Sequence, residues 1–234
     1  MKWLLLLALV VSQAHSAAVC DPQKFEGQYG VQLAGTTTIS GAVEPVALIG
    51  RLVFDGKGAV SGYVSVNFTG LLLGNPVTGS YQAGTDCSLT WKLQDDSGAY
   101  QNFAGTMTSD FLRVRFRQTD KGAAREGTMV RTPKECSAAA LQKRYDYAIK
   151  GSTTAGGIVE LGEAGNLVIN PSGGASAGQG TVQVDAECIA TFQLSIPGIA
   201  GVTNLRGVVL DEGREILAIQ TDPNTTVTAR FTAK

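Results

Sequence analysis

Short stretches of alternating apolar and polar residues run along most of this chain, and turn-forming residues interrupt them about every ten positions. Such alternation is typical of half-buried β-strands, because successive side chains point to opposite faces. In the first half it predicts strands at 29–35, 49–54, 59–67, 77–83, 87–94, 102–108, 112–118 and 127–131. In the second half it predicts strands at 145–150, 157–161, 166–170, 175–184, 187–195, 203–210, 215–220 and 226–232.

The two halves repeat the same sequence pattern. Cys20 and Tyr29 have the same spacing as Cys136 and Tyr145. Further along, 79–93 aligns without a gap on 180–194, and 103–120 aligns on 205–222. Matches that occur in the same order indicate a duplicated domain.

The predicted fold is therefore all-β: a tandem duplication of an approximately eight-stranded antiparallel barrel or barrel-like sandwich. We expect a signal peptide at 1–18, a first repeat at 19–134 and a second repeat at 135–234. A short helix is predicted at the start of each repeat, and the Ala-rich segment 137–144 has the length of two helical turns.

The cysteines fit this duplication. Alternation places Cys87, Leu89, Trp91 and Leu93 on one inner face and Cys188, Ala190, Phe192 and Leu194 on the equivalent one. Four cysteines allow three pairings. Equivalence of the repeats favours Cys20–Cys87 with Cys136–Cys188, whereas the other pairings join one repeat to the other.

Export is predicted by the first residues. Lys2, the apolar run 4–11 and the small residues at 14–18 have the order of a secretory signal peptide, so the protein is expected to be secreted or periplasmic. Removal of the signal peptide takes away His15, the only histidine, and leaves 18 basic against 20 acidic side chains. That near-neutral balance predicts no nucleic-acid partner, and no segment is long enough for a transmembrane helix.

The repeats differ on one outer face. The first has Arg113, Arg115 and Arg117 pointing outward, a candidate anion contact or a solvated face. At the matching strands, the second repeat has an outer apolar patch. We define this patch as Val208, Leu210, Leu217 and Ile219. An exposed patch of this kind marks a contact surface. It could cover the first repeat, a second copy in a homo-oligomer, or a foreign partner.

An insertion of fourteen residues distinguishes the first repeat. The segment 62–79 predicts a long hairpin whose apolar tip includes Phe68, Leu71, Leu72 and Leu73. This tip could contact a partner or a lipid surface, but we expect it to fold back as a plug for its own barrel. Asn67 and Asn224 begin glycosylation sequons.

The sequence offers few residues suited to catalysis or metal binding. Without histidine in the mature chain, a histidine-dependent nucleophile or an imidazole metal site is not expected, and no cofactor is predicted. Asp86 and Glu187 recur at equivalent positions, as do Asp120 and Asp222, so a carboxylate-dependent hydrolase is a third hypothesis.

The segment Phe25-Glu26-Gly27-Gln28-Tyr29 resembles the opening Gly-x-Trp region of calycins, the lipocalin and avidin barrels, with Tyr in place of Trp. The Gly-x-Tyr…Asp-Cys pattern is also similar to uncharacterised exported bacterial proteins. The calycin resemblance implies a barrel, but not biotin binding, because the mature chain keeps only Trp91.

Together these features predict a non-catalytic binding protein for a small apolar ligand or a glycan. The alternative is an extracellular structural or adhesion module that acts through its surfaces.

Overall fold

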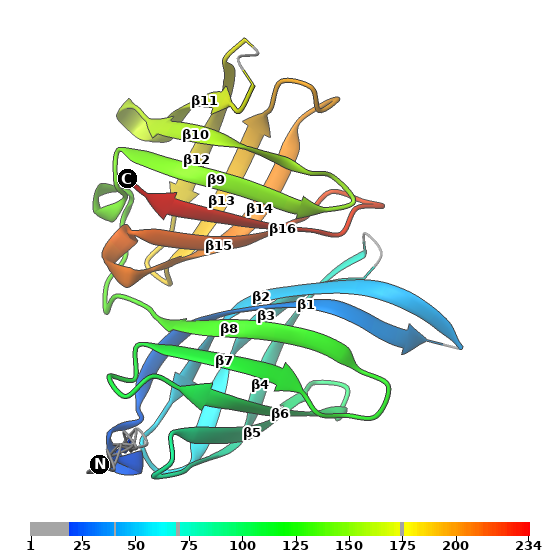
Figure 1. Cartoon of the computed structure of the whole chain (residues 1–234), viewed down its shortest axis with the longest axis vertical. Helices are drawn as coiled ribbons and strands as arrows, with labels where there is room; N and C mark the ends of the chain where they lie inside the picture. The colour runs from blue at the N-terminus through cyan, green and yellow to red at the C-terminus, as the bar shows by residue number, and fades with distance from the viewer. Residues whose placement is uncertain (1–18, 40, 69–70, 174–175) are drawn as a thin grey trace, which may run out of the picture.

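The computed structural model describes residues 19–39, 41–68, 71–173 and 176–234. Their strands form two closed antiparallel barrels of eight strands each, which lie one above the other in Figure 1. The predicted all-β tandem duplication is therefore confirmed, and the closed barrel replaces the sandwich alternative.

The first barrel contains strands β1 to β8. Their bounds are β1 Gly27–Ile39, β2 Ala42–Phe54, β3 Ala59–Phe68, β4 Leu71–Ala83, β5 Ser88–Asp95, β6 Tyr100–Met107, β7 Arg113–Gln118 and β8 Ala124–Arg131. Each strand pairs with the next along the chain, and β1 pairs with β8 to close the barrel.

The second barrel contains strands β9 to β16. Their bounds are β9 Arg144–Gly151, β10 Ala155–Leu161, β11 Asn166–Pro171, β12 Gly178–Val184, β13 Ile189–Ser195, β14 Thr203–Leu210, β15 Glu215–Gln220 and β16 Val227–Ala233. Pairing of β16 with β9 closes this barrel in the same way.

The inner faces follow the predicted alternation. Leu89, Trp91 and Leu93 of β5 are buried, whereas Thr90 and Lys92 between them are exposed. The equivalent residues of β13 are buried as well. Both predicted disulfides, Cys20–Cys87 and Cys136–Cys188, are present and tie the start of each repeat to its fifth strand.

The predicted helices are replaced by 3₁₀ turns. The first is η1, Pro22–Lys24, and the second is η2, Ala138–Ala140. The two-turn helix expected at 137–144 is wrong because Leu141 is extended, with φ −70° and ψ 141°, and its side chain is buried. Tertiary packing of Leu141 and entry into β9 override the helix propensity of the alanines. No helix among the described residues is long and apolar enough to cross a membrane.

The two barrels pack against each other through β1 and β2 on one side and β14 and β15 on the other. Two polar side chains of the first barrel bind main-chain oxygens of the second. Gln32 Nε2 donates to Ala218 O at 2.8 Å, and Asn67 Nδ2 donates to Gln220 O at 2.8 Å. Apolar packing and directional bonds thus combine at this interface.

Candidate binding site in the first barrel

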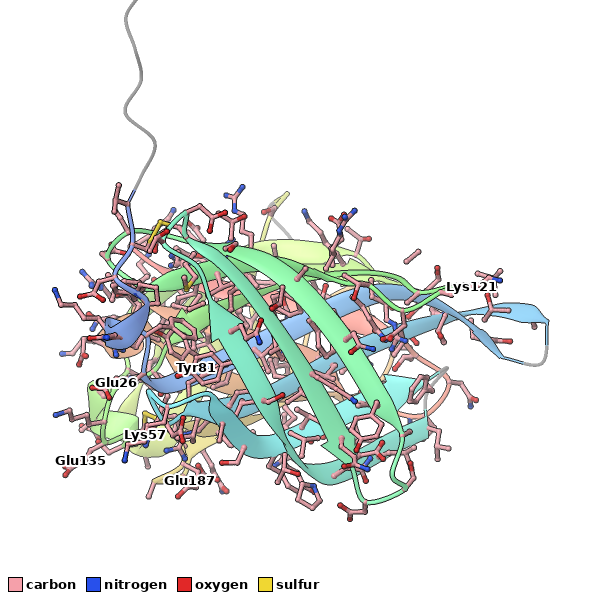
Figure 2. All side chains as sticks on the ribbon, turned by 90° about the horizontal axis from the view of Figure 1, so that it is seen from below. Glu26, Lys57, Tyr81, Lys121, Glu135 and Glu187 are labelled. Atoms are coloured by element: carbon pink, nitrogen blue, oxygen red, sulfur yellow. A yellow bond between two sulfur atoms is a disulfide. The ribbon has the colours of Figure 1, made fainter. Side chains whose placement is uncertain are left out.

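One end of the first barrel is closed by aromatic side chains. Phe25, which follows η1, packs on Phe54 and Tyr29 with ring centroids 4.9 Å and 5.3 Å apart. Tyr29 Oη donates to Phe111 O at 2.8 Å, and Tyr81 Oη donates to Phe25 O at 3.0 Å. Figure 2 shows Tyr81, Glu26 and Lys57 toward this end and Lys121 at the opposite end. The aromatic cluster and the Cys20–Cys87 disulfide close this end to a ligand.

Inside the barrel lies an apolar hollow of about 30 Å³. We call it the barrel-1 hollow. Its apolar lining comes from β1 to β7: Val31, Leu33, Leu48, Leu52, Val64, Val66, Val77, Trp91, Leu93, Phe103 and Phe116. This space is far smaller than the roughly 300–1,000 Å³ of a usual ligand pocket, so it can take only a small apolar group.

Aromatic rings form one wall of the barrel-1 hollow. Trp91 stacks on Phe103 with centroids 5.1 Å apart and meets Phe116 edge-on at 4.9 Å. Three polar residues, Asn75, Asp95 and Gln101, complete the lining. An apolar wall with a few polar groups is the usual composition of a small-molecule site.

A second, polar cleft of about 630 Å³ lies around the β7–β8 turn. We call it the polar cleft; Gln118, Asp120 and Arg125 are among its lining residues. Asp120 accepts hydrogen bonds from Asn102 N at 2.9 Å and from Gln118 Nε2 at 2.6 Å. Burial alone raises the pKa of Asp120, but these bonds outweigh it and hold the pKa below its ordinary value.

Arg125 is the buried cation of the polar cleft. Its side chain is 9% exposed, and its Nη2 lies 3.5 Å from Thr37 Oγ1. Its Nε has no hydrogen-bond partner, and none of the ion pairs among the described residues includes it. Burial lowers the pKa of Arg125, and the Asp120 carboxylate offsets part of that effect.

The second barrel is built differently at the corresponding places. Phe192 and Phe231 stack face to face across its interior, with centroids 4.8 Å apart. Gly35 pairs with Arg125 in the first barrel, and the equivalent Gly151 pairs with Val227. Val227 is 1% exposed, so an apolar side chain fills the place that Arg125 has in the first barrel.

The predicted apolar patch faces the first barrel. Its four members are 0 to 2% exposed: Val208, Leu210, Leu217 and Ile219. They belong to one apolar cluster with Ala47, Ile49 and Val130 of the first barrel. The structure therefore places the patch at the contact between repeats of the same chain.

The arginine stripe of β7 is divided between two environments. Arg113 forms an ion pair with Glu215 of the second barrel, whose other carboxylate oxygen lies 2.8 Å from Arg230 Nη2. Arg115 and Arg117 are exposed on the outer face. The structure therefore does not bring the three arginines together around one site.

The predicted long hairpin is present as β3 and β4, which pair as far as Phe68 and Leu71. The expectation that its tip folds back as a plug is wrong. Leu71 is 62% exposed, and Leu72 and Leu73 are also exposed, because the regular pairing extends the hairpin instead of turning it inward. Phe68 is half-buried. At the sequon, Asn67 is buried and bonded to the second barrel, so its amide is not open to a glycan in this fold.

A groove of about 420 Å³ runs between the barrels. Arg51 and Tyr63 line it from the first barrel, and Asp185, Glu187 and Arg206 line it from the second. Arg51 forms an ion pair with Glu187. No group of acidic, cysteine or histidine side chains within the described ranges is arranged to hold a metal ion.

Sequence reasoning missed the barrel-1 hollow and Arg125. The alternation of side chains along β8 could have placed Arg125. Met129 and Gly127 face inward, so Arg125, two positions before Gly127, faces inward too. The hollow has no comparable signal, because it depends on how the side chains of seven strands fit together.

Comparisons with known proteins do not assign this chain to a family. No known protein family matches this sequence, and no curated protein is significantly similar to it. Among solved structures, isotype 1 transferrin binding protein B from serogroup B Neisseria meningitidis is similar with a TM-score of 0.30 and 8% identity. That similarity covers 89% of this chain and 76% of the other. A TM-score this low supports no argument about shared function.

Proposed function

We propose that this protein is an exported, non-catalytic binding protein that holds the apolar part of a small molecule in its first barrel. The observation that carries the proposal is the barrel-1 hollow, which is apolar and closed at one end by the Phe25 cluster. In the second barrel, Phe192 and Phe231 stack on each other across the interior instead. In this account the first barrel binds and the second supports it.

A non-catalytic role is supported by the local bonds of the recurring carboxylates. Asp86 accepts hydrogen bonds from Ser88 N at 3.1 Å and Ser88 Oγ at 2.6 Å. Asp120 and Asp222 each accept from an asparagine and a glutamine. Such bonds hold turns and strand ends in place, which accounts for these residues without a catalytic task.

Export, to the periplasm or to the outside of the cell, is supported by the two disulfides, since such bonds persist in oxidising compartments. The proposed signal peptide at 1–18 lies outside the described residues.

A second candidate is a surface-contact module. It is favoured by the exposed leucines 71, 72 and 73 at the end of the β3–β4 hairpin. The apolar patch of the second barrel does not support this role, because the first barrel covers it.

A glycan ligand would instead fit the groove between the barrels, where half-exposed Tyr63 lies among charged side chains.

Trp91 provides a direct test of the main proposal. It is the only tryptophan after residue 18, and it lines the barrel-1 hollow, so its fluorescence reports on occupancy of that space. Because the hollow is narrow, short probes are used: titration with ethanol, propan-1-ol and butan-1-ol is expected to give a saturable change in emission. A strictly linear response to all of them would overturn the proposal.

A cavity-filling variant locates the binding. Val66→Ile adds one methylene group beside the barrel-1 hollow and is expected to weaken alcohol binding at least fivefold while leaving the fold intact. Val60→Ile makes the same change in the same strand but outside the hollow lining, and serves as the matched control. Equal binding by Val66→Ile and the native protein would place the ligand elsewhere.

A further inference from the structure

The groove between the barrels is lined by both repeats. Arg51 of β2 and Tyr63 of β3 are paired neighbours on the outer face of the first barrel. The second barrel contributes Asp185 and Glu187 of the β12–β13 turn, and Arg206 of β14. The volume of the groove, about 420 Å³, falls within the range of ordinary ligand pockets, unlike that of the barrel-1 hollow. A ligand in this groove therefore contacts both repeats at once.

Tyr63 gives the groove an aromatic surface. This residue is 46% exposed, although most of its side chain is apolar. Its hydroxyl end occupies the place of a side chain at Gly74 of β4, because a β-carbon built on Gly74 would lie 2.1 Å from Tyr63 Oη and 3.0 Å from Cζ. The absence of a side chain at position 74 thus lets the phenol rest against β4. An exposed ring held against a sheet offers a surface on which a ligand can stack.

The charged side chains of the groove balance one another. Arg51 forms an ion pair with Glu187, which joins the two barrels. Burial lowers the pKa of Arg51, and the Asp185 carboxylate offsets part of that effect. Arg206 is partly exposed, and none of the ion pairs among the described residues includes it. Two cations and two carboxylates therefore line the groove, and their balance favours a neutral ligand.

A saccharide has the chemistry that this arrangement recognises. Each of its hydroxyl groups can accept a hydrogen bond from an arginine and donate one to a carboxylate at the same time. The C–H face of a sugar ring is apolar and packs on an exposed aromatic ring such as that of Tyr63. A purely apolar molecule would leave the charged groups without partners, and an ion would meet charges of its own sign.

We propose that the groove between the barrels binds a neutral saccharide, with one sugar ring stacked on Tyr63 and hydroxyl groups bonded to Arg206 and Asp185. The site is complete only when both barrels are present, so the duplication itself creates it. This site shares no lining residue with the barrel-1 hollow, and neither proposal depends on the other.

The test is a calorimetric titration of the native protein at pH 6 with three neutral trisaccharides: maltotriose, cellotriose and triacetylchitotriose. At least one of them is expected to bind saturably. Its affinity is expected to be at least tenfold higher than that of three comparison probes: anionic trigalacturonate, the cationic chitosan trimer, and the neutral peptide acetyl-trialanine amide.

Substitutions on both walls locate the binding. Tyr63→Ala is expected to weaken it at least tenfold, and Tyr63→Phe, which keeps the ring, is expected to bind more tightly than Tyr63→Ala. Tyr100→Ala is the matched control, because Tyr100 is a similarly exposed tyrosine of β6 outside the groove lining. Arg206→Ala is expected to weaken binding at least fivefold, whereas Arg115→Ala, at an exposed arginine of β7, is expected to retain the native affinity.

The outcomes separate this site from the barrel-1 hollow. Failure of all three trisaccharides to bind would overturn the saccharide proposal, as would tighter binding of the peptide or of either charged trimer. Native affinity in Tyr63→Ala or in Arg206→Ala would also overturn it, and an unchanged urea midpoint shows that each variant is folded. The Trp91 response to butan-1-ol is expected to stay unchanged in Tyr63→Ala. Absence of that response in a native protein that binds a trisaccharide would overturn the proposed function alone.

Discussion

Gly30 of β1 and Val208 of β14 are in contact across the interface between the barrels. A β-carbon built on Gly30 would lie 2.7 Å from both methyl groups of Val208, closer than real side chains approach. The absence of a side chain at position 30 therefore allows the apolar patch of the second barrel to reach the first. The patch and Gly30 act together in holding the two repeats as one unit.

The first prediction is that Gly30→Val weakens this interface. Overpacking of a close contact costs roughly 1–3 kcal/mol, and we expect a loss of this size in the free energy of unfolding measured in urea. Thr36→Val, on the same face of β1 but outside the apolar cluster between the barrels, should change it by less than about 0.5 kcal/mol. Unchanged stability in Gly30→Val would show that the barrels are not packed as described.

Much of this architecture could be predicted from sequence. The alternation around Trp91 identified an inner face, and the duplication selected the disulfides, because both depend on local period or on equivalence. The helix at 137–144 failed because Leu141 is drawn into the core, which local propensity does not register. The exposed position of Leu71 could not be foreseen either, since apolar character alone does not say whether a hairpin extends or folds back.

The second prediction concerns Glu215, which is 3% exposed and lies between Arg113 and Arg230. Glu215→Gln should lower the free energy of unfolding by about 2–4 kcal/mol, because two arginines lose their shared, buried partner. Glu160→Gln, in a solvent-exposed pair with Arg144, is the control, with an expected loss below about 1 kcal/mol. Equal losses in the two variants would contradict the assignment of Glu215 as an inter-barrel contact.

The third prediction is a loss of stability at alkaline pH. Burial raises the pKa of Tyr29 and of Tyr145 to about 12, above the ordinary value of 10.0. The folded state holds both phenolic protons more tightly, so this contribution is complete below pH 10 and is lost as the pH rises toward 12. A two-unit shift corresponds to at most about 3 kcal/mol for each tyrosine.

Urea unfolding measured between pH 9 and pH 11.5 checks this dependence. Tyr29→Phe should reduce the alkaline slope by about one proton, and it should also cost about 1 kcal/mol at neutral pH through loss of the bond to Phe111 O. A free energy of unfolding that stays constant over this pH range would contradict the buried phenols.

The fourth prediction concerns the disulfides. Cys20–Cys87 spans 67 residues and Cys136–Cys188 spans 52. In the chain-entropy treatment each loop stabilises the fold by about 4 kcal/mol, slightly more for the longer one. Replacing either pair by serines should lower the free energy of unfolding by roughly that amount, whereas a loss below about 1 kcal/mol in both would contradict the prediction. A peptide map that joins Cys20 to Cys136 would contradict the pairing itself.

The most direct test of the central claim is native mass spectrometry of the full protein, purified gently from its own host. The account predicts an added mass of one small molecule, lost on denaturation and reduced in Val66→Ile prepared in the same way. A native protein that carries no added mass, and gains none when incubated with butan-1-ol, would contradict it.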